Sequence, residues 1–171
     1  MPSVAFPFVL KRGSDVIDGL EITSTVETIH GLLRLELGHL TLQWRVSRST
    51  DVVGLEIRTD KEVEPTRETS VPLSAIAGAV VRWKWRWWRP GFHLILTAAD
   101  LAAFDVISGQ SGLKLDHPAE LVIRLTRSNR AAADEFAGEL NLAVAERELR
   151  SAESAERLPG EDSRSWLPEG R

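Results

Sequence analysis

The stretch GLLRLELGHLTLQWRV, residues 31–46, decides the fold that we expect for this chain. Apolar and polar residues alternate on both sides of Gly38, which is typical of two half-buried strands joined by a tight turn. A type II′ turn at Gly38-His39 would place the large apolar residues of both strands in cross-strand pairs on one face. The pairs expected from this register are Leu37–Leu40, Leu35–Leu42 and Leu33–Trp44.

Alternation of the same kind continues through most of the chain between residues 25 and 126. Short runs with a period of two, separated by turn residues, are typical of antiparallel sheets. The polar stretch 60–68, which holds Pro65, and the glycine-containing stretch 105–118 are predicted loops. About seven strands are expected, at residues 31–37, 40–46, 52–59, 69–73, 78–88, 92–98 and 120–126.

The period changes to that of a helix after residue 128. The segment 128–150 has good helix formers and no proline, and Ser128 or Asn129 can cap its start. Apolar residues recur there at spacings of three and four, which predicts an amphipathic helix that packs on the sheet. The expected apolar face consists of Ala132, Ala133, Phe136, Leu140, Ala143 and Val144.

These patterns divide the 171 residues into three parts. Residues 1–24 are expected to form a partly ordered N-terminal extension, and residues 25–150 to form one domain with its own core. Residues 151–171 lack a period and are rich in Glu, Ser, Pro and Gly, so we expect an acidic flexible tail.

The net charge of −4 is unevenly distributed. Residues 1–130 hold 16 Lys/Arg and 15 Asp/Glu, whereas residues 131–171 hold 5 Arg and 10 Asp/Glu. A nucleic-acid-binding domain is usually strongly basic, so no nucleic-acid partner is expected. The chain has no cysteine, which excludes disulfides, thiolate zinc sites and cysteine nucleophiles.

The N-terminal segment does not look like a targeting signal. The short apolar run VAFPFVL, residues 4–10, is followed rather than preceded by Lys11 and Arg12, unlike a secretory signal. No apolar stretch approaches the roughly 20 residues that span a bilayer as a helix. We therefore expect a cytoplasmic protein.

Four segments together resemble the bacterial pleckstrin-homology-like (PH-like) family. They are HGLLRLELGHLTLQWRV at 30–46, VPLSAIAGAV at 71–80, the tryptophan-rich hairpin at 81–96, and ELVIRL at 120–125 leading into NRAAADEFAGEL at 129–140. The resemblance covers roughly residues 25–150. It implies a mainly β fold, in which about seven antiparallel strands form a small sandwich or barrel capped by one amphipathic C-terminal helix. It also implies a binding module rather than an enzyme.

Members of this family that bind phosphoinositides carry a run of Lys and Arg around the loop between their first two strands. Here the corresponding loop is residues 36–39, with only Arg34 and Arg45 nearby. The resemblance therefore implies that phosphoinositide binding is not the function of this chain.

No arrangement of residues typical of catalysis is found. There is no glycine-rich phosphate loop, no Gly-x-Ser-x-Gly motif and no pair of histidines at helical spacing. SGQSG at 108–112 is interpreted as a flexible turn. The four histidines fall in separate segments and are expected on the surface; they are His30, His39, His93 and His117. We predict no catalytic residue, no metal site and no cofactor.

The stretch VRWKWRWWRPGFHLIL, residues 81–96, holds four of the six tryptophans interleaved with cations. A turn at Pro90-Gly91 would make it a hairpin, with Trp87–Leu94, Trp85–Leu96 and Trp83–Ala98 as pairs on the core face. Each buried tryptophan hides roughly 150–250 Å², so burial outweighs the mutual repulsion of the cations on the other face. We therefore expect Trp83, Trp85 and Trp87 to be mainly structural.

The outer face and the turn of this hairpin are the candidate contact surface. The candidate residues are Arg82, Lys84, Arg86, Trp88, Arg89 and His93. An exposed indole among cations suits an acidic protein segment, either in a partner or in a second copy, and the acidic tail is one such segment. The alternatives are an anionic membrane surface, or an aromatic ring that simply lies flat beneath an arginine.

Overall fold

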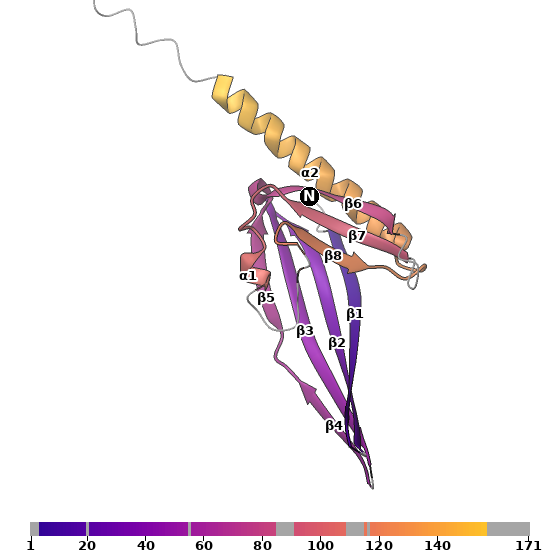
Figure 1. Cartoon of the computed structure of the whole chain (residues 1–171). Helices are drawn as coiled ribbons and strands as arrows, with labels where there is room; N and C mark the ends of the chain where they lie inside the picture. The colour runs from indigo at the N-terminus through magenta and orange to yellow at the C-terminus, as the bar shows by residue number, and fades with distance from the viewer. Residues whose placement is uncertain are drawn as a thin grey trace, which may run out of the picture.

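The computed structural model describes residues 4–19, 21–54, 56–84, 91–108, 115 and 117–156. The fold in this part of the chain is mainly β, with two antiparallel sheets and a long C-terminal helix, as the sequence predicts (Figure 1). The strands are β1 (Val4–Asp18), β2 (Glu21–Glu36), β3 (His39–Val53), β4 (Ile57–Val63), β5 (Arg67–Pro72), β6 (Ile76–Lys84), β7 (Gly91–Ala98) and β8 (Glu120–Arg124). The helices are η1 (Leu73–Ala75), α1 (Asp105–Ser108) and α2 (Arg130–Glu156).

The described strands form two separate sheets rather than a closed barrel. The first sheet has the order β1-β2-β3-β4, and β5 also pairs with β3. The strands β4 and β5 lie along the same edge, because β4 pairs with Ser47–Val53 and β5 with His39–Trp44. The second sheet has the order β6-β7-β8, and α2 packs mainly against β6.

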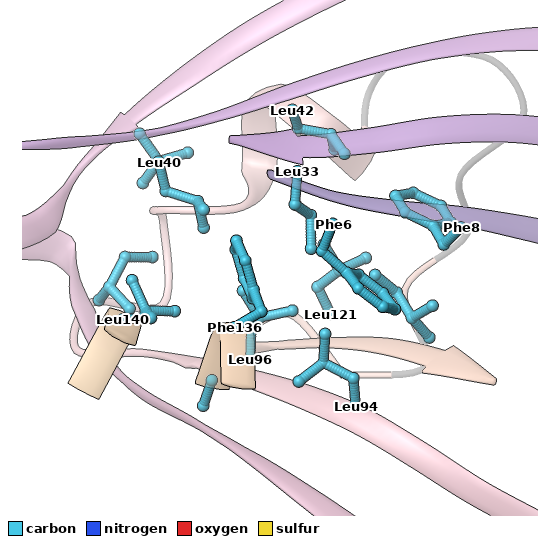
Figure 2. Close-up of a cluster of buried hydrophobic side chains, with 14 of the residues drawn as sticks. Phe6, Phe8, Leu33, Leu40, Leu42, Leu94, Leu96, Leu121, Phe136 and Leu140 are labelled. Atoms are coloured by element: carbon cyan, nitrogen blue, oxygen red, sulfur yellow. The ribbon is translucent and has the colours of Figure 1, made fainter. Parts of the chain in front are cut away.

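The hydrophobic core lies between the two sheets and the first half of α2 (Figure 2). The first sheet contributes Phe6, Phe8, Leu33, Leu40 and Leu42, the second Leu94, Leu96 and Leu121, and α2 contributes Phe136 and Leu140. The rings of Phe6 and Phe136 lie 5.9 Å apart between centroids, so the first strand and the last helix meet directly. This contact ties the two ends of the fold together.

The β2–β3 hairpin forms, but its predicted register is wrong by two residues. Leu35 pairs with Leu40 and Leu33 with Leu42, and the turn residues are Leu37 and Gly38. Both turn residues have positive φ, 37° and 85°, as a type I′ turn requires. A shift of two residues leaves every side chain on its predicted face, so alternation alone cannot detect it.

The first strand begins far earlier than the predicted sheet. Val4–Asp18, within the range expected as an N-terminal extension, form β1 and pair with β2 along their whole length. Phe6 and Phe8 of β1 are fully buried. The described sheet therefore includes the chain from Val4 onward, and the proline in VAFPFVL does not prevent pairing because β1 is an edge strand.

The strands β1 to β4 continue beyond the core as a ribbon that tapers to the β1–β2 and β3–β4 turns (Figure 1). Part of the predicted loop at 60–68 is therefore strand, and the predicted strand at 52–59 instead spans the β3–β4 turn. One face of the ribbon carries cross-strand ion pairs from Arg48 to Glu27 (2.8 Å) and to Glu62 (3.4 Å). The other face carries an exposed aliphatic row at the tip, one residue from each strand: Ile17, Ile22, Val53 and Ile57.

The helix α2 starts at Arg130 and runs six residues past the predicted end. The buried residues Ala133, Phe136, Leu140 and Val144 match the predicted face, whereas Ala132 is exposed. Asn141 pairs with the free edge of β6: its Oδ1 accepts from the Ala79 amide (2.8 Å) and its Nδ2 donates to the Ala79 carbonyl (2.9 Å). The side chain of Asn141 thus provides hydrogen-bond partners for the amide and the carbonyl of Ala79, which do not pair with β7.

Candidate functional site

The candidate site lies where β6 ends and β7 begins, beside the first turn of α2. The predicted register of this hairpin is wrong by six residues, because Trp83 pairs with Phe92 and Lys84 with Gly91. The residues between the two strands, 85–90, lie outside the described residues. The predictions for Trp85, Arg86, Trp87, Trp88 and Arg89 therefore concern a part of the chain that the structure does not describe.

Trp83 lies on the predicted face of β6 but at the end of the sheet, beyond the core. Its partner Phe92 is half-buried, and the two rings meet edge to face at 4.8 Å between centroids and 68° between planes. Trp83 remains 50% exposed. Trp83 is thus much more exposed than the buried aromatic residues of the core.

Arg130, the first residue of α2, lies over the ring of Phe92. Its guanidinium carbon is 4.1 Å from the centroid of the Phe92 ring, which is a cation–π contact. The sequence suggested an aromatic ring beneath an arginine at Trp88; in the structure Phe92 has that arrangement. Arg130 also forms an ion pair with Asp134 at 3.6 Å, one helical turn later.

Three further cations lie at the same end of the second sheet but on its outer face, because Arg82 and Lys84 alternate with Trp83 along β6 and so point away from the aromatic pair. Arg82 and Lys84 project from β6, and Arg124 lies on β8 opposite His93. All three are exposed, and none forms an ion pair with any residue in the described part of the chain. We call this end of the sheet the basic aromatic surface: Arg82, Lys84, His93 and Arg124 lie on its outer face, and Trp83, Phe92 and Arg130 lie on the face that α2 covers.

His93 lies in the middle of the basic aromatic surface, between Arg82 and Arg124 on the two neighbouring strands. Burial lowers its pKa below the ordinary value of 6.5, and the positive charges of Lys84 and Arg124 lower the pKa further. A hydrogen bond from Nδ1 to the Gly91 carbonyl (3.0 Å) acts in the opposite direction. At neutral pH the imidazole is thus uncharged and donates to the start of β7.

Of the six predicted contact residues, the structure describes Arg82, Lys84 and His93, and it brings all three together. Sequence reasoning missed Arg124, Arg130 and the exposure of Trp83. The strand ELVIRLT and the helix start at residue 130 were both expected, but the order of strands within the sheet was not, and that order places Arg124 beside His93.

Neither a metal site nor a membrane-spanning helix is found in the part of the chain that the structure describes. No group of three or more His, Asp or Glu there is placed to hold a metal ion. Among the helices that could be searched, none combines the length and the apolar character that crossing a bilayer needs. His117 accepts a hydrogen bond from the Ala119 amide (3.1 Å) near the start of β8, which is a structural role.

Comparison of the chain with protein-family models, with curated proteins and with solved structures finds no match.

Proposed function

We propose that this protein is a non-enzymatic binding and assembly module, and that it contacts an acidic protein surface through the basic aromatic surface. The order of its elements supports a PH-like arrangement. The five strands of the first sheet, with β4 and β5 along one edge, precede the three strands of the second, and a C-terminal helix follows. Such a scaffold presents its strand ends and turns to partners.

The observation that carries the proposal is the group of cations on the outer face at the end of the second sheet. Arg82, Lys84 and Arg124 have no ion-pair partner among the described residues, and the half-exposed Trp83 lies on the other face of the same strand end. Arg82 and Lys84 are two residues apart on one strand, about 7 Å, and repel each other by roughly 0.6 kcal/mol in water. Covering the exposed half of Trp83 would remove about 100 Å² from water, worth about 2.5 kcal/mol. A partner that places carboxylates on the outer face offsets the repulsion, and one that also reaches around the end of β6 covers the indole.

An acidic protein surface fits better than an anionic membrane because the molecule is acidic away from this surface. The whole chain carries a net charge of −4, and the ribbon and the helix present many exposed carboxylates. Each cation near an anionic bilayer gains only about 1 kcal/mol, and neighbouring carboxylates reduce that gain. Repulsion by the same carboxylates does not prevent a local contact with one acidic protein segment.

The test compares two probes: a fluorescent poly-glutamate peptide, and phosphatidylserine vesicles in a sedimentation assay. We expect the full chain to bind the peptide with an affinity that falls as salt rises, and not to sediment with the vesicles. Arg82→Glu with Lys84→Glu should weaken peptide binding at least about tenfold, as interfacial charge reversals do.

The matched control is Arg58→Glu with Lys61→Glu, which makes the same charge change on exposed residues of β4. This variant should retain most of the peptide affinity. Equal losses in both variants would show that only net charge matters and would contradict the proposal. Sedimentation with vesicles at low salt, without peptide binding, would replace it by the membrane alternative.

A further inference from the structure

The outer face of the first sheet, which is turned away from the core, exposes aliphatic side chains along the ribbon. Their exposed fractions range from 38% to 78%. The cross-strand pairs and the alternation of each strand place all of them on this one face. They are Ile17, Ile22, Val26, Val53, Ile57 and Val63. The solvated face of an antiparallel sheet is ordinarily polar, and large exposed apolar patches mark contact surfaces.

Charged residues on the outer face lie in two sections of the ribbon. Asp15 and Asp51 share the row of cross-strand neighbours next to the tip, whereas Lys61 lies one row and Lys11 two rows further from the tip. None of these four residues forms an ion pair with another described residue. By contrast, the core-side face of the ribbon pairs its charges internally through Arg48. The outer face therefore has an acidic section and a basic section that are both available to another molecule.

We propose that a second copy of the chain packs on this outer face, sheet against sheet, around a two-fold axis at the row that holds Val26. This row lies midway between Asp15 and Lys11, because Val26 pairs with Gly13, which is two residues from each. A two-fold axis that crosses the strands here turns one ribbon end for end over the other. Asp15 of each copy then lies opposite Lys11 of the other copy, so a single face supplies both halves of the contact.

The same axis brings apolar side chains together. Val26 meets its own equivalent at the axis, and Ile17 lies opposite Val9, because these two residues of β1 are equally far from the axis. Both are exposed on this face. Lys61 lies close to the axis, one row and one strand away from Asp51 of the other copy, which its long side chain reaches. Sheets that pack face to face lie about 10 Å apart, so the side chains of the two copies interdigitate.

The outer face of the ribbon is large enough for a stable dimer. Four strands about 4.8 Å apart span about 19 Å, and the rows from Val9 to Ile17 span about 27 Å. The flat area is thus about 500 Å² per copy, and the relief of the side chains raises the accessible area toward the roughly 600–1,000 Å² per partner of specific interfaces.

A second copy fits this face better than a membrane does. Asp15, Asp18 and Asp51 lie beside the apolar tip, and the surface of an anionic bilayer would repel these carboxylates. A second copy instead places a cation opposite each Asp15. The interface contains no residue of the second sheet, so the inference does not depend on the basic aromatic surface or on the function proposed above.

The test is an exchange of charges, measured by sedimentation velocity on the full chain. Lys11→Glu places a carboxylate opposite Asp15, and Asp15→Lys places an ammonium group opposite Lys11. Each variant alone should dimerise at least about tenfold more weakly than the wild type, because two contacts per dimer change from attraction to repulsion. The variant with both substitutions should regain the dimer, since the opposite charges have only changed places. An equimolar mixture of the two single variants should dimerise as well.

The matched controls are Arg58→Glu and Asp60→Lys, which make the same two charge changes on exposed residues of the core-side face of the ribbon. Both control variants should dimerise like the wild type. Val26→Glu brings two carboxylates together at the axis and should weaken the dimer at least about tenfold. Arg82→Glu with Lys84→Glu should leave the dimer unchanged, which separates this inference from the proposed function.

Amide hydrogen exchange provides a second measurement. Exchange at residues 22–25 should be slower in the dimer than in the dilute monomer, because opening of the ribbon would break the interface. Equal exchange rates in the two states would place the dimer contact elsewhere and overturn the inference.

A wild-type chain that stays monomeric to about 1 mM also overturns the inference. The same conclusion follows if the variant with both Lys11→Glu and Asp15→Lys dimerises no better than either single variant, or if the controls weaken the dimer equally. Sedimentation of the wild type with neutral phosphatidylcholine vesicles, abolished by Val26→Glu, would assign the outer face to a membrane instead of a second copy.

Discussion

Gly31 occupies the core face of β2, between Phe8 on β1 and Trp44 on β3. A Cβ on this glycine would overlap the Phe8 ring, which lies across the vacant position. The missing side chain thus gives two large aromatic residues room on neighbouring strands. This is one physical reason why Trp44 lies opposite Gly31 rather than opposite Leu33, as the sequence suggested.

We expect Gly31→Ala to lower the free energy of unfolding by about 1–3 kcal/mol, the range for overfilled cores. Gly13→Ala is the matched control, because a Cβ at Gly13 of β1 would meet only the Thr25 carbonyl oxygen at 4.0 Å. Urea denaturation of both variants measures the difference. Equal free energies for the two alanine variants would show that the contact with Phe8 does not matter.

His93 should make the stability of the fold depend on pH. Its pKa is lowered in the folded state, chiefly by burial. As the pH falls below the ordinary value of 6.5, the unfolded chain takes up the proton first, so folding loses stability; above that value both states are neutral and the effect vanishes. Stability should therefore fall between about pH 7.5 and about pH 5.5.

His93→Gln should reduce this loss of stability, measured as the difference between urea midpoints at the two pH values. The same substitution at His30, which is exposed on β2, serves as the control. A pH dependence that is unchanged by His93→Gln would mean that the lowered pKa of His93 has no part in it.

Among the elements, α2 is held on β6 by apolar packing, to which the side chain of Asn141 adds two hydrogen bonds. Gly78 allows this approach, because a Cβ at this residue, whose φ is 152°, would lie 2.8 Å from Asn141 Oδ1. We expect Asn141→Ala to lower the free energy of unfolding by about 1–2 kcal/mol. Two backbone groups of Ala79 lose their partner, and the helix propensity of alanine offsets part of the loss.

Glu135→Ala, an exposed change on the same helix, should alter the free energy of unfolding by less than about 0.5 kcal/mol. Urea denaturation of both variants provides the comparison. Asn141→Ala would contradict this account if it were as neutral as the control.

The ribbon formed by β1 to β4 should open independently of the core. In β2, Ile29 and Leu33 are fully buried, whereas Ile22 and Val26 are exposed in the ribbon. Local opening requires little energy where few apolar contacts are lost. Amide hydrogen exchange at Ile22–Thr25 should therefore be faster than at Ile29–Leu35 by at least about tenfold. Uniform protection along β2 would show that the ribbon and the core unfold together.

The sequence predicts which face of a sheet each side chain occupies better than it predicts which residues pair across neighbouring strands. Leu33, Leu40 and Leu42 lie on the side that alternation assigns to them, because the direction of a side chain is fixed by the local period. Register depends on turn type and on cross-strand packing. The register of the β2–β3 hairpin follows from the turn at Leu37-Gly38. In the β6–β7 hairpin Lys84 pairs with Gly91, so more residues separate the two strands than the two-residue turn that the sequence suggested.

The candidate site could be predicted only in part for the same reason. Arg82, Lys84 and His93 belong to one continuous stretch, so sequence reasoning could find them. Arg124 lies at this end of the sheet because β8 pairs with β7, and Arg130 lies there because α2 begins beside Phe92. Neither position follows from the local sequence. Val4, Leu37, Leu73 and Leu142 line one groove although they are far apart in the sequence, and no local sequence pattern could predict that they lie together.

Two projecting surfaces with exposed apolar residues, the basic aromatic surface and the tip of the ribbon, differ in charge across the whole molecule. Arg82, Lys84 and Arg124 make the first surface positive, whereas Asp15, Asp18 and Asp51 lie beside the tip of the ribbon. Electrostatic complementarity therefore favours contact of an acidic protein segment with the basic aromatic surface and not with the ribbon tip.

Hydroxyl-radical footprinting of the full chain, with and without poly-glutamate, locates the contact. Binding of the peptide should reduce the oxidation of His93 and Trp83, whereas Ile17 and Ile57 at the ribbon tip should be oxidised equally in both samples. Protection of Ile17 and Ile57, with no change at His93 and Trp83, would place the contact on the ribbon and show that the basic aromatic surface does not bind the peptide.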